Sequence, residues 1–516
     1  MTMQRVTLSV ESSGVVLAGI QVRSVRGREA VSELFRFAVE LVSDAEVPLP
    51  AAIATNGELT LVLEIGTTFT RRIHGMIARI ERDLGGATTC AVTRLELVPR
   101  VHRATLVESP SVYVGATLAE VLAAKLDGYQ FSGASGQDAG DYELQLIDTL
   151  PRRDLTVQYG ESDLAFLLRL CEHLGVSFFF EQTIDRDRIV FTDHNGCFRR
   201  CEGASDAHFD GTGSAQGVFA LLEEQTVIPN YFQERDQNPT LAASELEGDR
   251  YLGDDVGAGG VIEFGANPGT AAEATRLAQV RAEERRCRQV SYRGKSTLAG
   301  FTAGGRTILR DHPQLGTPAS GFELLLVEVV HEVVVPTTWD TTTAPTYRNE
   351  FVAVPFANRF RPERKTTRLR MPSVVTGVIQ PGPNGEVDGV AQLDEAGRYQ
   401  VFFHFDIESP FRPRSSSPIR MAQPFAGSSH GMHFPLRRGT EVLVAFINGD
   451  PDRPVIVGAL PNATAPAAVR QKDAQYHRIR SPHGTVIEFA ATGGSAPPRH
   501  LPTGATTPTT TPNQGS

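Results

Sequence analysis

The strongest constraint on the fold is the run 448–458, which predicts a tight turn between two apolar strands. Glycine, aspartate and proline at 449–451 favour the turn, because glycine tolerates unusual φ values and proline fixes φ near the value that a turn needs. Residues 441–446 before the turn and 455–457 after it are apolar enough to form strands. The run therefore predicts a β-hairpin.

Further short strands precede this hairpin within the block 372–462. A polar turn at 394–398 leads into a strand over 399–406, and residues 417–427 predict one more strand. Five short strands with glycine-rich turns in about 90 residues are typical of an OB-type barrel. The sequence therefore predicts a small barrel over this block.

At these residues the chain resembles the VgrG family, the spike proteins of type VI secretion and of related contractile injection machines. The family carries a DE-x-GR turn, an F-H-W-D strand end, an A-Q-x-W-A-G strand, a G-x-EV-x-V strand and a GDPDRP turn, in this order. Matching segments occur here at 394–398, 403–406, 422–427, 439–444 and 449–454.

The resemblance implies structural roles for residues of these turns and strands. They are Asp394, Glu395, Gly397, Arg398, Asp406, Gly427, Gly439, Glu441, Gly449, Asp450, Pro451, Arg453 and Pro454. Phe405 and Phe425 stand where the family has tryptophan, and Pro435 is displaced from the family's proline before Arg-x-Gly. The resemblance implies that both phenylalanines keep an aromatic core, in a divergent branch of the family.

The rest of the chain predicts antiparallel strands interrupted by three helices. Residues 34–41, 59–65, 72–80 and 95–99 suggest half-buried strands, the first two alternating with period two. Capping boxes begin at Thr117 and Thr270, and Ser162 can cap a third helix that Gly175 ends. In that third helix an apolar stripe predicts burial. The stripe is Leu164, Leu167, Leu168, Cys171 and Leu174.

This larger part is also similar to the VgrG family, whose N-terminal region resembles the hub of contractile-phage tails. The resemblance rests on residues 157–170 and on Gly175-Val176, which match QY-x-ES-D-x-x-F-x-x-RL followed by G-(I/V). It implies a pair of small β-barrel-like domains with inserted helices.

The predicted fold class is thus mainly β with inserted helices (α+β), in a chain long enough for two to four domains. The expected order is a phage-hub-like double β-barrel region (1–358), a basic linker (359–371), an OB-fold barrel (372–462), a short needle stub (463–492) and a flexible Thr/Pro/Gly-rich tail (493–516). In the stub, residues 476–489 predict two short strands around Pro482-His483-Gly484. The family continues here into a trimeric β-helix needle, so this needle is either naturally short or truncated.

Charge and cysteine content bear on partners and compartment. A net charge of -10 argues against a nucleic-acid partner, because phosphates would be repelled. The basic run at 359–370 predicts an exposed linker or a salt-bridged seam between subunits. Five cysteines suit a reducing bacterial cytoplasm, and the N-terminus lacks the apolar core of a signal peptide. We therefore expect export without a cleaved signal, on firing of the apparatus.

Three patterns suggest chemistry, and each has a structural interpretation that we prefer. Residues 427–431 match G-x-S-x-G with Ser429 as nucleophile, but Pro435 and Gly439 oppose the helix that this motif needs. His194, Cys197 and Cys201 lack the fourth ligand of a zinc site. The aromatic residues of the barrel suggest base stacking, but core packing explains them equally. We predict no catalytic residue, metal or cofactor.

The resemblance implies a structural homotrimer at the tip of a contractile injection apparatus. Its implied partners are a hexameric inner-tube protein, baseplate proteins and a PAAR-type tip protein, and its contact with the target membrane is mechanical. The alternative within this class is the spike of an extracellular phage-tail-like particle or of a phage tail. More distant alternatives are a hydrolase that uses Ser429 and an OB-fold nucleic-acid binder.

Overall fold

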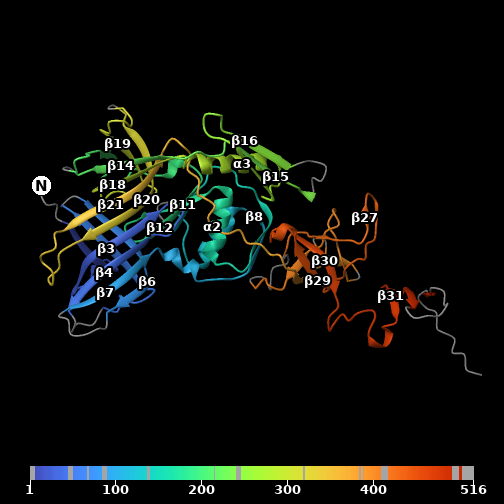
Figure 1. Cartoon of the computed structure of the whole chain (residues 1–516). Helices are drawn as coiled ribbons and strands as arrows, with labels where there is room; N and C mark the ends of the chain where they lie inside the picture. The colour runs from blue at the N-terminus through green and yellow to red at the C-terminus, as the bar shows by residue number, and fades with distance from the viewer. Residues whose placement is uncertain are drawn as a thin grey trace, which may run out of the picture. The chain divides into compact units, whose positions relative to one another are not determined.

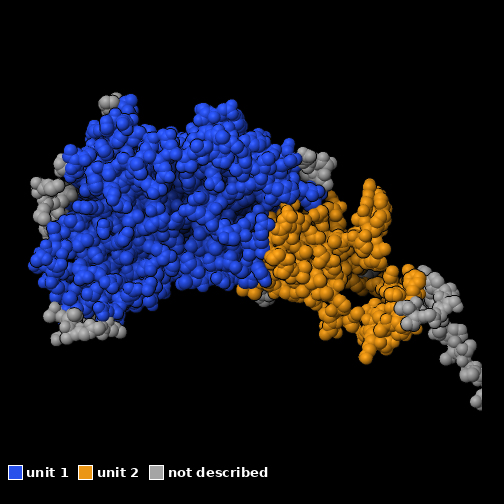
Figure 2. Space-filling model, viewed as in Figure 1, with its two compact units in different colours: residues 1–370 blue, residues 371–516 orange. Residues whose placement is uncertain are grey.

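The computed structural model divides the chain into two compact units, Met1–Arg370 and Met371–Ser516, coloured separately in Figure 2. It describes residues 6–44, 50–66, 69–83, 90–135, 140–213, 216–239, 246–317, 320–382, 385–387, 389–407, 416–490 and 499–501. None of the helices in these ranges combines the length and the apolar character needed to cross a bilayer.

Unit 1 is built on a 13-stranded sheet whose first half uses the N-terminal strands (Figure 1). Apolar residues alternate along these strands and fill one core beneath them. The strands, in sheet order, are β3 (Ile20–Ala30), β4 (Arg36–Asp44), β7 (Cys90–Val98), β6 (Phe69–Arg82), β5 (Glu58–Ile65), β1 (Val6–Ser12) and β2 (Val15–Val16).

The second half of the sheet comes from strands more than 200 residues along the chain and has its own core. Its strands are β14 (Val218–Gln225), β18 (Val290–Ser296), β21 (Thr346–Pro355), β20 (Phe322–Val334), β19 (Arg306–Arg310) and β13 (Asp206–His208). The two halves are joined by the antiparallel β3–β20 ladder, in which Val25 lies opposite Val333 and Glu29 opposite Val329.

Each half contains a glycine directly opposite a buried phenylalanine of the neighbouring strand. Gly27 faces Phe37 between β3 and β4, and Gly294 faces Phe351 between β18 and β21. A Cβ atom at either glycine would overlap the ring of the phenylalanine opposite. The two rings therefore lie over bare backbone, and this arrangement recurs in both halves of the sheet.

The inserted helices and small sheets pack beside the large sheet. The helices are α1 (Leu118–Gly128), α2 (Asp163–Leu174) and α3 (Ala271–Arg286), with one-turn 3₁₀ segments at Asn195–Cys197 and a longer one at Arg100–Thr105. The small sheets pair β8 (Ser111–Ala116) with β10 (Arg153–Gln158), join β11 (Ser177–Gln182), β12 (Asp187–Thr192) and β9 (Tyr142–Gln145), and join β16 (Leu246–Tyr251), β15 (Tyr231–Asp236) and β17 (Gly260–Phe264).

The predicted helix signals are confirmed. Thr117 forms a complete capping box with Glu120, and the Ser162 and Thr270 side chains accept hydrogen bonds at the starts of α2 and α3. Gly175 ends α2 with a φ of 74°. Phe166, absent from the predicted stripe, is fully buried, whereas Leu164 and Leu168 are only partly buried.

Unit 2 contains a five-stranded sheet, two small hairpins and a terminal three-stranded sheet. The five-stranded sheet has the order β25 (Val401–Phe403), β22 (Val375–Ile379), β29 (Glu441–Phe446), β30 (Pro454–Leu460) and β26 (Arg420–Met421). The hairpins are β23 (Glu386–Val387) with β24 (Val390–Ala391) and β27 (Ala426–Gly427) with β28 (His430–Gly431). The terminal sheet is β31 (Tyr476–Arg480), β32 (Val486–Ala490) and β33 (Arg499–Leu501), and 3₁₀ turns lie at Ile447–Gly449 and Gln471–Asp473.

The predicted fold class, mainly β with inserted helices, is confirmed, with two differences in detail. Residues 417–427 form two short strands, β26 and β27, because the chain leaves one sheet and enters a separate hairpin. The two strands predicted around Pro482-His483-Gly484 are present as β31 and β32, and β33 adds a strand within the segment expected to be flexible. The other residues of that segment, 493–498 and 502–516, lie outside the described residues.

The glycine–phenylalanine pairs give a first prediction. Gly27→Ala should destabilise unit 1 by about 1–3 kcal/mol, because the added methyl group forces the buried Phe37 ring to move. Gly128→Ala is the matched control, since the space around Gly128 is open and its backbone is not left-handed. Thermal unfolding should show a lower Tm for Gly27→Ala alone; equal Tm values for the two variants would contradict the steric argument.

Candidate functional site

The predicted structural residues lie in the turns that connect the strands of the unit 2 barrel. In the 394–398 turn, Asp394 accepts hydrogen bonds from the N–H groups of Ala396 (3.0 Å) and Arg398 (2.8 Å). The Arg398 guanidinium returns to the same carboxylate at 2.7 Å. Gly397 adopts a φ of 73°, which explains the glycine, and Glu395 is exposed. The aspartate thus organises the turn.

The second turn, at 448–454, relies on consecutive left-handed residues. Asn448 has a φ of 56° and Gly449 a φ of 71°. The Asp450 N–H donates to Ile447 O, and the Arg453 N–H donates to Asp450 O at 2.9 Å. Asp450 and Pro451 are buried, and Pro454 begins β30. The turn therefore closes the β29–β30 hairpin that the sequence predicts.

The other predicted positions are distributed around the barrel. Asp406 is buried just after β25, and Glu441 begins β29, where its side chain accepts from Asn462 at 2.9 Å. Gly439 has a φ of 82°, and its N–H donates to Ile379 O. Gly427 lies in the exposed β27–β28 hairpin.

Arg398 and Arg453 come together on the barrel beside Arg420. Burial lowers the pKa of Arg420, and the positive charges of Arg453 and Arg398 lower it further. Apart from this group and the two turns, the predicted residues do not converge on one point, as expected for structural positions.

The aromatic residues of the barrel divide between the core and the surface. Tyr399 and Phe403 are fully buried, and the Phe403 ring stacks on Phe405 with centroids 5.0 Å apart. Phe425 is 58% exposed, so the expectation that it keeps the aromatic core is wrong. It lies in the separate β27–β28 hairpin, which carries it away from the five-stranded sheet.

Phe425 is one of a set of large apolar side chains that unit 2 leaves exposed. The others are Val374, Val387, Ile407, Met432, Phe434, Val457, Ile479 and Phe489. Such an accumulation on one small unit is typical of a surface that another chain covers.

The basic run before unit 2 is anchored in unit 1, so the expectation of an exposed linker is wrong. Arg361 is 1% exposed, and its guanidinium donates to Gly175 O (2.7 Å), Asp193 O (3.0 Å) and the Glu283 carboxylate (2.7 Å). Phe360 beside it belongs to a buried apolar cluster.

A second arginine of the run is paired twice. Arg364 makes ion pairs with Glu263 on β17 (2.6 Å) and with Glu284 on α3 (3.2 Å). Burial alone would lower the pKa of Arg364, but these carboxylates raise it above its ordinary value. The segment is thus held by charges from elements distant in sequence, and no local signal in the run predicts this.

The three patterns that suggested chemistry have ordinary structural settings. Ser429 has a φ of 61° in a hairpin turn, with strand β28 after it and no helix, so the geometry of a nucleophile elbow is absent there. His194 accepts from the Gly196 N–H at 3.1 Å, and its Nε2 lies 3.1 Å from Cys197 Sγ.

Cys201 does not join His194 and Cys197. It packs in the core of the second half-sheet, whereas Cys197 packs in a different cluster, and burial raises the pKa of Cys201 to about 12. In the described part of the chain, no three histidine, cysteine, aspartate or glutamate side chains are grouped to hold a metal ion.

Comparison with known proteins assigns both units. Residues 28–336 match the family model of the phage tail baseplate hub (GPD), and residues 385–460 match the type VI secretion system/phage-baseplate injector OB domain. The E. coli c3393 protein, described as a component of the type VI secretion system with structural similarity to T4 tail proteins gp27 and gp5, superimposes with a TM-score of 0.61 at 20% identity. That match covers 87% of this chain and 99% of the other.

Curated relatives are spike proteins of type VI secretion. VgrG4b of Pseudomonas aeruginosa is 28% identical over 496 residues, which cover 90% of this chain and 58% of the relative. The actin cross-linking toxin VgrG1 of Vibrio cholerae is 26% identical, over 90% of this chain and 42% of its own length. The chain thus spans about half the length of the relatives it matches. The resemblance to VgrG proteins is confirmed.

The buried arginine gives a second prediction. Arg361→Met should destabilise unit 1 by about 3–5 kcal/mol, because it leaves the Glu283 carboxylate without its closest cation. Lys365→Met, in the same run but 61% exposed, is the control and should change stability by less than about 1 kcal/mol. Urea unfolding measures both; similar midpoints for the two variants would show that Arg361 is not an anchor.

The hairpin position of Ser429 gives a third prediction. Ser429→Ala should leave the assembly state and any ester hydrolysis unchanged, because the hydroxyl lies on an exposed turn without the strand–turn–helix setting of a nucleophile. The measurement is turnover of a chromogenic ester by the purified protein and the variant. Turnover that disappears in the variant would establish a hydrolase.

Proposed function

We propose that this chain, which belongs to the phage tail baseplate hub (GPD) family, is the trimeric hub and spike base of a contractile injection apparatus of the type VI secretion kind. The observation that supports this most directly is the order of its parts, a hub region followed by an injector OB domain in one chain. In this role unit 1 contacts the inner tube and unit 2 carries the tip. The function is structural and not enzymatic.

The domain division that we propose follows this order. Residues 1–358 form the hub region, 359–371 connect it to the barrel, 372–462 form the OB barrel, 463–492 form a short needle stub and 493–516 a tail. The anchoring of Arg361 and Arg364 supports a connector that is fixed at its hub end. A fixed connector transmits force better than a free tether.

Three-fold assembly is supported by the exposed apolar side chains of unit 2. Phe425 (58% exposed), Phe434 (53%) and Val457 (45%) would face water in a monomer. Their burial between three barrels would stabilise the assembly, at roughly 25 cal/mol per Å² of apolar surface covered. Closed three-fold symmetry also satisfies the need for a pointed object without open ends.

The proposed partners follow from this arrangement. A hexameric inner-tube protein would contact the hub, whose two similar half-sheets in three copies give six quasi-equivalent positions. Baseplate proteins would surround it, and a PAAR-type tip protein would cap the stub. We propose synthesis in a bacterial cytoplasm, expulsion when the apparatus fires, mechanical contact with the target membrane and no nucleic-acid partner.

The fourth prediction concerns the assembly state. The full chain should have a mass of roughly 168 kDa in solution, three times 55.9 kDa, when measured by light scattering at micromolar concentration. A stable monomer at that concentration would contradict the proposed function.

A matched pair of variants tests which surface holds the trimer together. Phe434→Asp should lower the mass toward that of a monomer, because it places a charge among apolar side chains that the trimer covers. Glu395→Lys, on an exposed turn of the same barrel, should leave the mass unchanged. A trimer that persists in Phe434→Asp would exclude this surface as the interface.

A further inference from the structure

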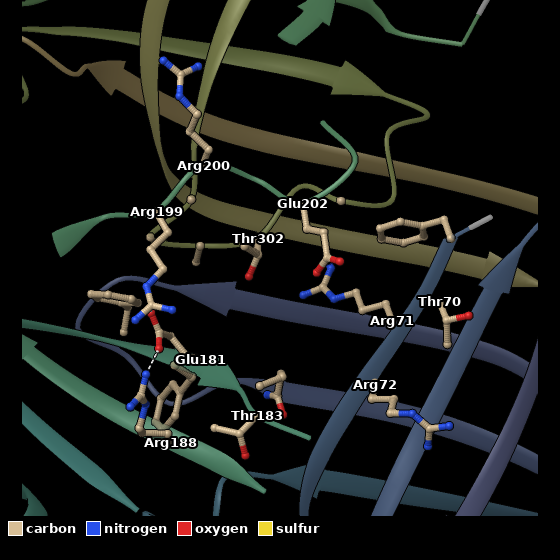
Figure 3. A pocket seen from close by; sticks show the side chains of 18 residues that line it. Thr70, Arg71, Arg72, Glu181, Thr183, Arg188, Arg199, Arg200, Glu202 and Thr302 are labelled. Carbon is tan, nitrogen blue, oxygen red and sulfur yellow. Dashed lines mark hydrogen bonds and ion pairs between the residues drawn. The ribbon is translucent and has the colours of Figure 1, made fainter. Parts of the chain in front are cut away.

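A pocket of about 430 Å³ lies in unit 1 between parts of the chain that are distant in sequence (Figure 3). One wall is β6 at 69–72, and another is β11 with its following turn at 179–183. Residues 199–202 and 300–305 complete it. Sites between substructures are frequent positions for ligands, and this volume lies within the usual range.

The wall at β6 offers main-chain groups that no neighbouring strand uses. β6 pairs with β5 from Phe69 onward, but its pairing with β7 begins only at Met76. The His74 N–H points away from β5, because it donates to the Gln182 side chain at 2.9 Å. By the two-residue period of a strand, the main-chain groups of Thr70 and Arg72 point the same way, toward the pocket.

The facing wall has the same property. The Phe178 N–H donates to Ser32 Oγ and its carbonyl accepts from the Ser32 N–H, so the main-chain groups of Phe178 point away from β12. Two residues later, Phe180 must also turn its N–H and carbonyl away from β12, on the side where the pocket lies. Two strand edges with available main-chain groups therefore border one cavity.

The side chains around the pocket favour an anionic guest. Five arginines and two glutamates line it, in a chain whose net charge is -10. Glu181 is engaged by Arg188 and Arg199 together, as Figure 3 shows. Arg199 remains 66% exposed, and Arg200, whose nearest carboxylate is 3.9 Å away, is 45% exposed. Both guanidiniums can reach a ligand at the rim.

The inner wall lets an extended backbone approach closely. Gly304 has a φ of 79°, and a Cβ atom there would lie 2.8 Å from the Phe179 ring, so this wall has no room for a side chain. Gly300 and Gly305 also line the cavity, beside the rings of Phe69 and Phe180. Glycine permits the approach of another main chain, and the rings offer apolar contact to its side chains.

We propose that this cavity, the strand-edge pocket, binds an extended acidic peptide segment of another protein. The segment adds as a strand to the free edge of β6 and takes main-chain hydrogen bonds from Thr70 and Arg72. Its carboxylates pair with Arg199 and Arg200, and its apolar side chains contact Phe69 and Phe180. The proposal depends on unit 1 alone and holds whatever the assembly state of the chain.

The test uses the full-length protein and a defined probe. The probe is a fluorescein-labelled pool of seven-residue peptides that alternate Val, Ile or Thr with Asp or Glu, followed by fluorescence polarisation. The comparison pool has Lys at every acidic position. We expect the acidic pool to bind at least about tenfold more tightly than the lysine pool, because the exposed guanidiniums attract one and repel the other.

Three variants assign the binding to the pocket. Arg199→Glu removes a rim charge, and Thr70→Pro removes one outward N–H without breaking the β5 ladder, since proline is tolerated on a free edge. Each should weaken binding of the acidic pool by about tenfold or more. Arg79→Glu changes an exposed arginine of the same strand outside the pocket and should leave binding unchanged.

Hydrogen exchange supplies a readout that does not depend on the variants. Bound peptide should slow exchange of the Thr70 and Arg72 amides and leave the β14 amides unaffected. Absence of binding at millimolar peptide, equal binding of both pools, or binding insensitive to both Arg199→Glu and Thr70→Pro would overturn the proposal.

Discussion

The buried guanidinium of Arg361 is the interaction on which the arrangement of unit 1 depends most. It contacts the carbonyl that ends α2 at Gly175, the carbonyl of Asp193 just after β12, and Glu283 on α3. Three elements that are up to about 190 residues away in sequence are therefore joined by one side chain. Because an isolated buried charge is very unfavourable, the partners must be present together, and the segment that leads to the barrel is fixed in place.

A second buried polar group lies where the two halves of the large sheet meet. Glu29 on β3 is paired with Arg71 on β6 and accepts from the Thr302 hydroxyl, while His331 on β20 contacts both Arg71 and Tyr347. Burial favours a higher pKa for Glu29, but Arg71 and His331 bring this pKa below its ordinary value. Burial and Arg71 lower the pKa of His331, which favours the neutral imidazole. The β3–β20 ladder thus has a satisfied polar core and not a purely apolar one.

Local features of the fold could be predicted from the sequence, and features that depend on distant partners could not. The caps at Thr117, Ser162 and Thr270 follow from short-range hydrogen bonds, so a few neighbouring residues suffice to identify them. The burial of Arg361 depends on Glu283, 78 residues away, and a run of arginines by itself suggests solvent exposure. Phe425 was assigned to the core on its residue type, but a hairpin that no periodicity predicts carries it outward. The strand-edge pocket is likewise invisible in the sequence, because it depends on which strand edges remain unpaired.

The two units satisfy their polar and apolar groups in different ways, and this difference bears on mechanism. Unit 1 buries its charges in ion pairs between distant elements, so its internal geometry is fixed within a single chain. Unit 2 leaves Phe425, Phe434 and Val457 exposed, so its folding is stabilised further when another surface covers them. Stability and assembly are therefore coupled in the barrel and largely separate in the hub. A spike that must form only in its apparatus would benefit from this division, because the hub can fold first and the barrels then gain stability from one another.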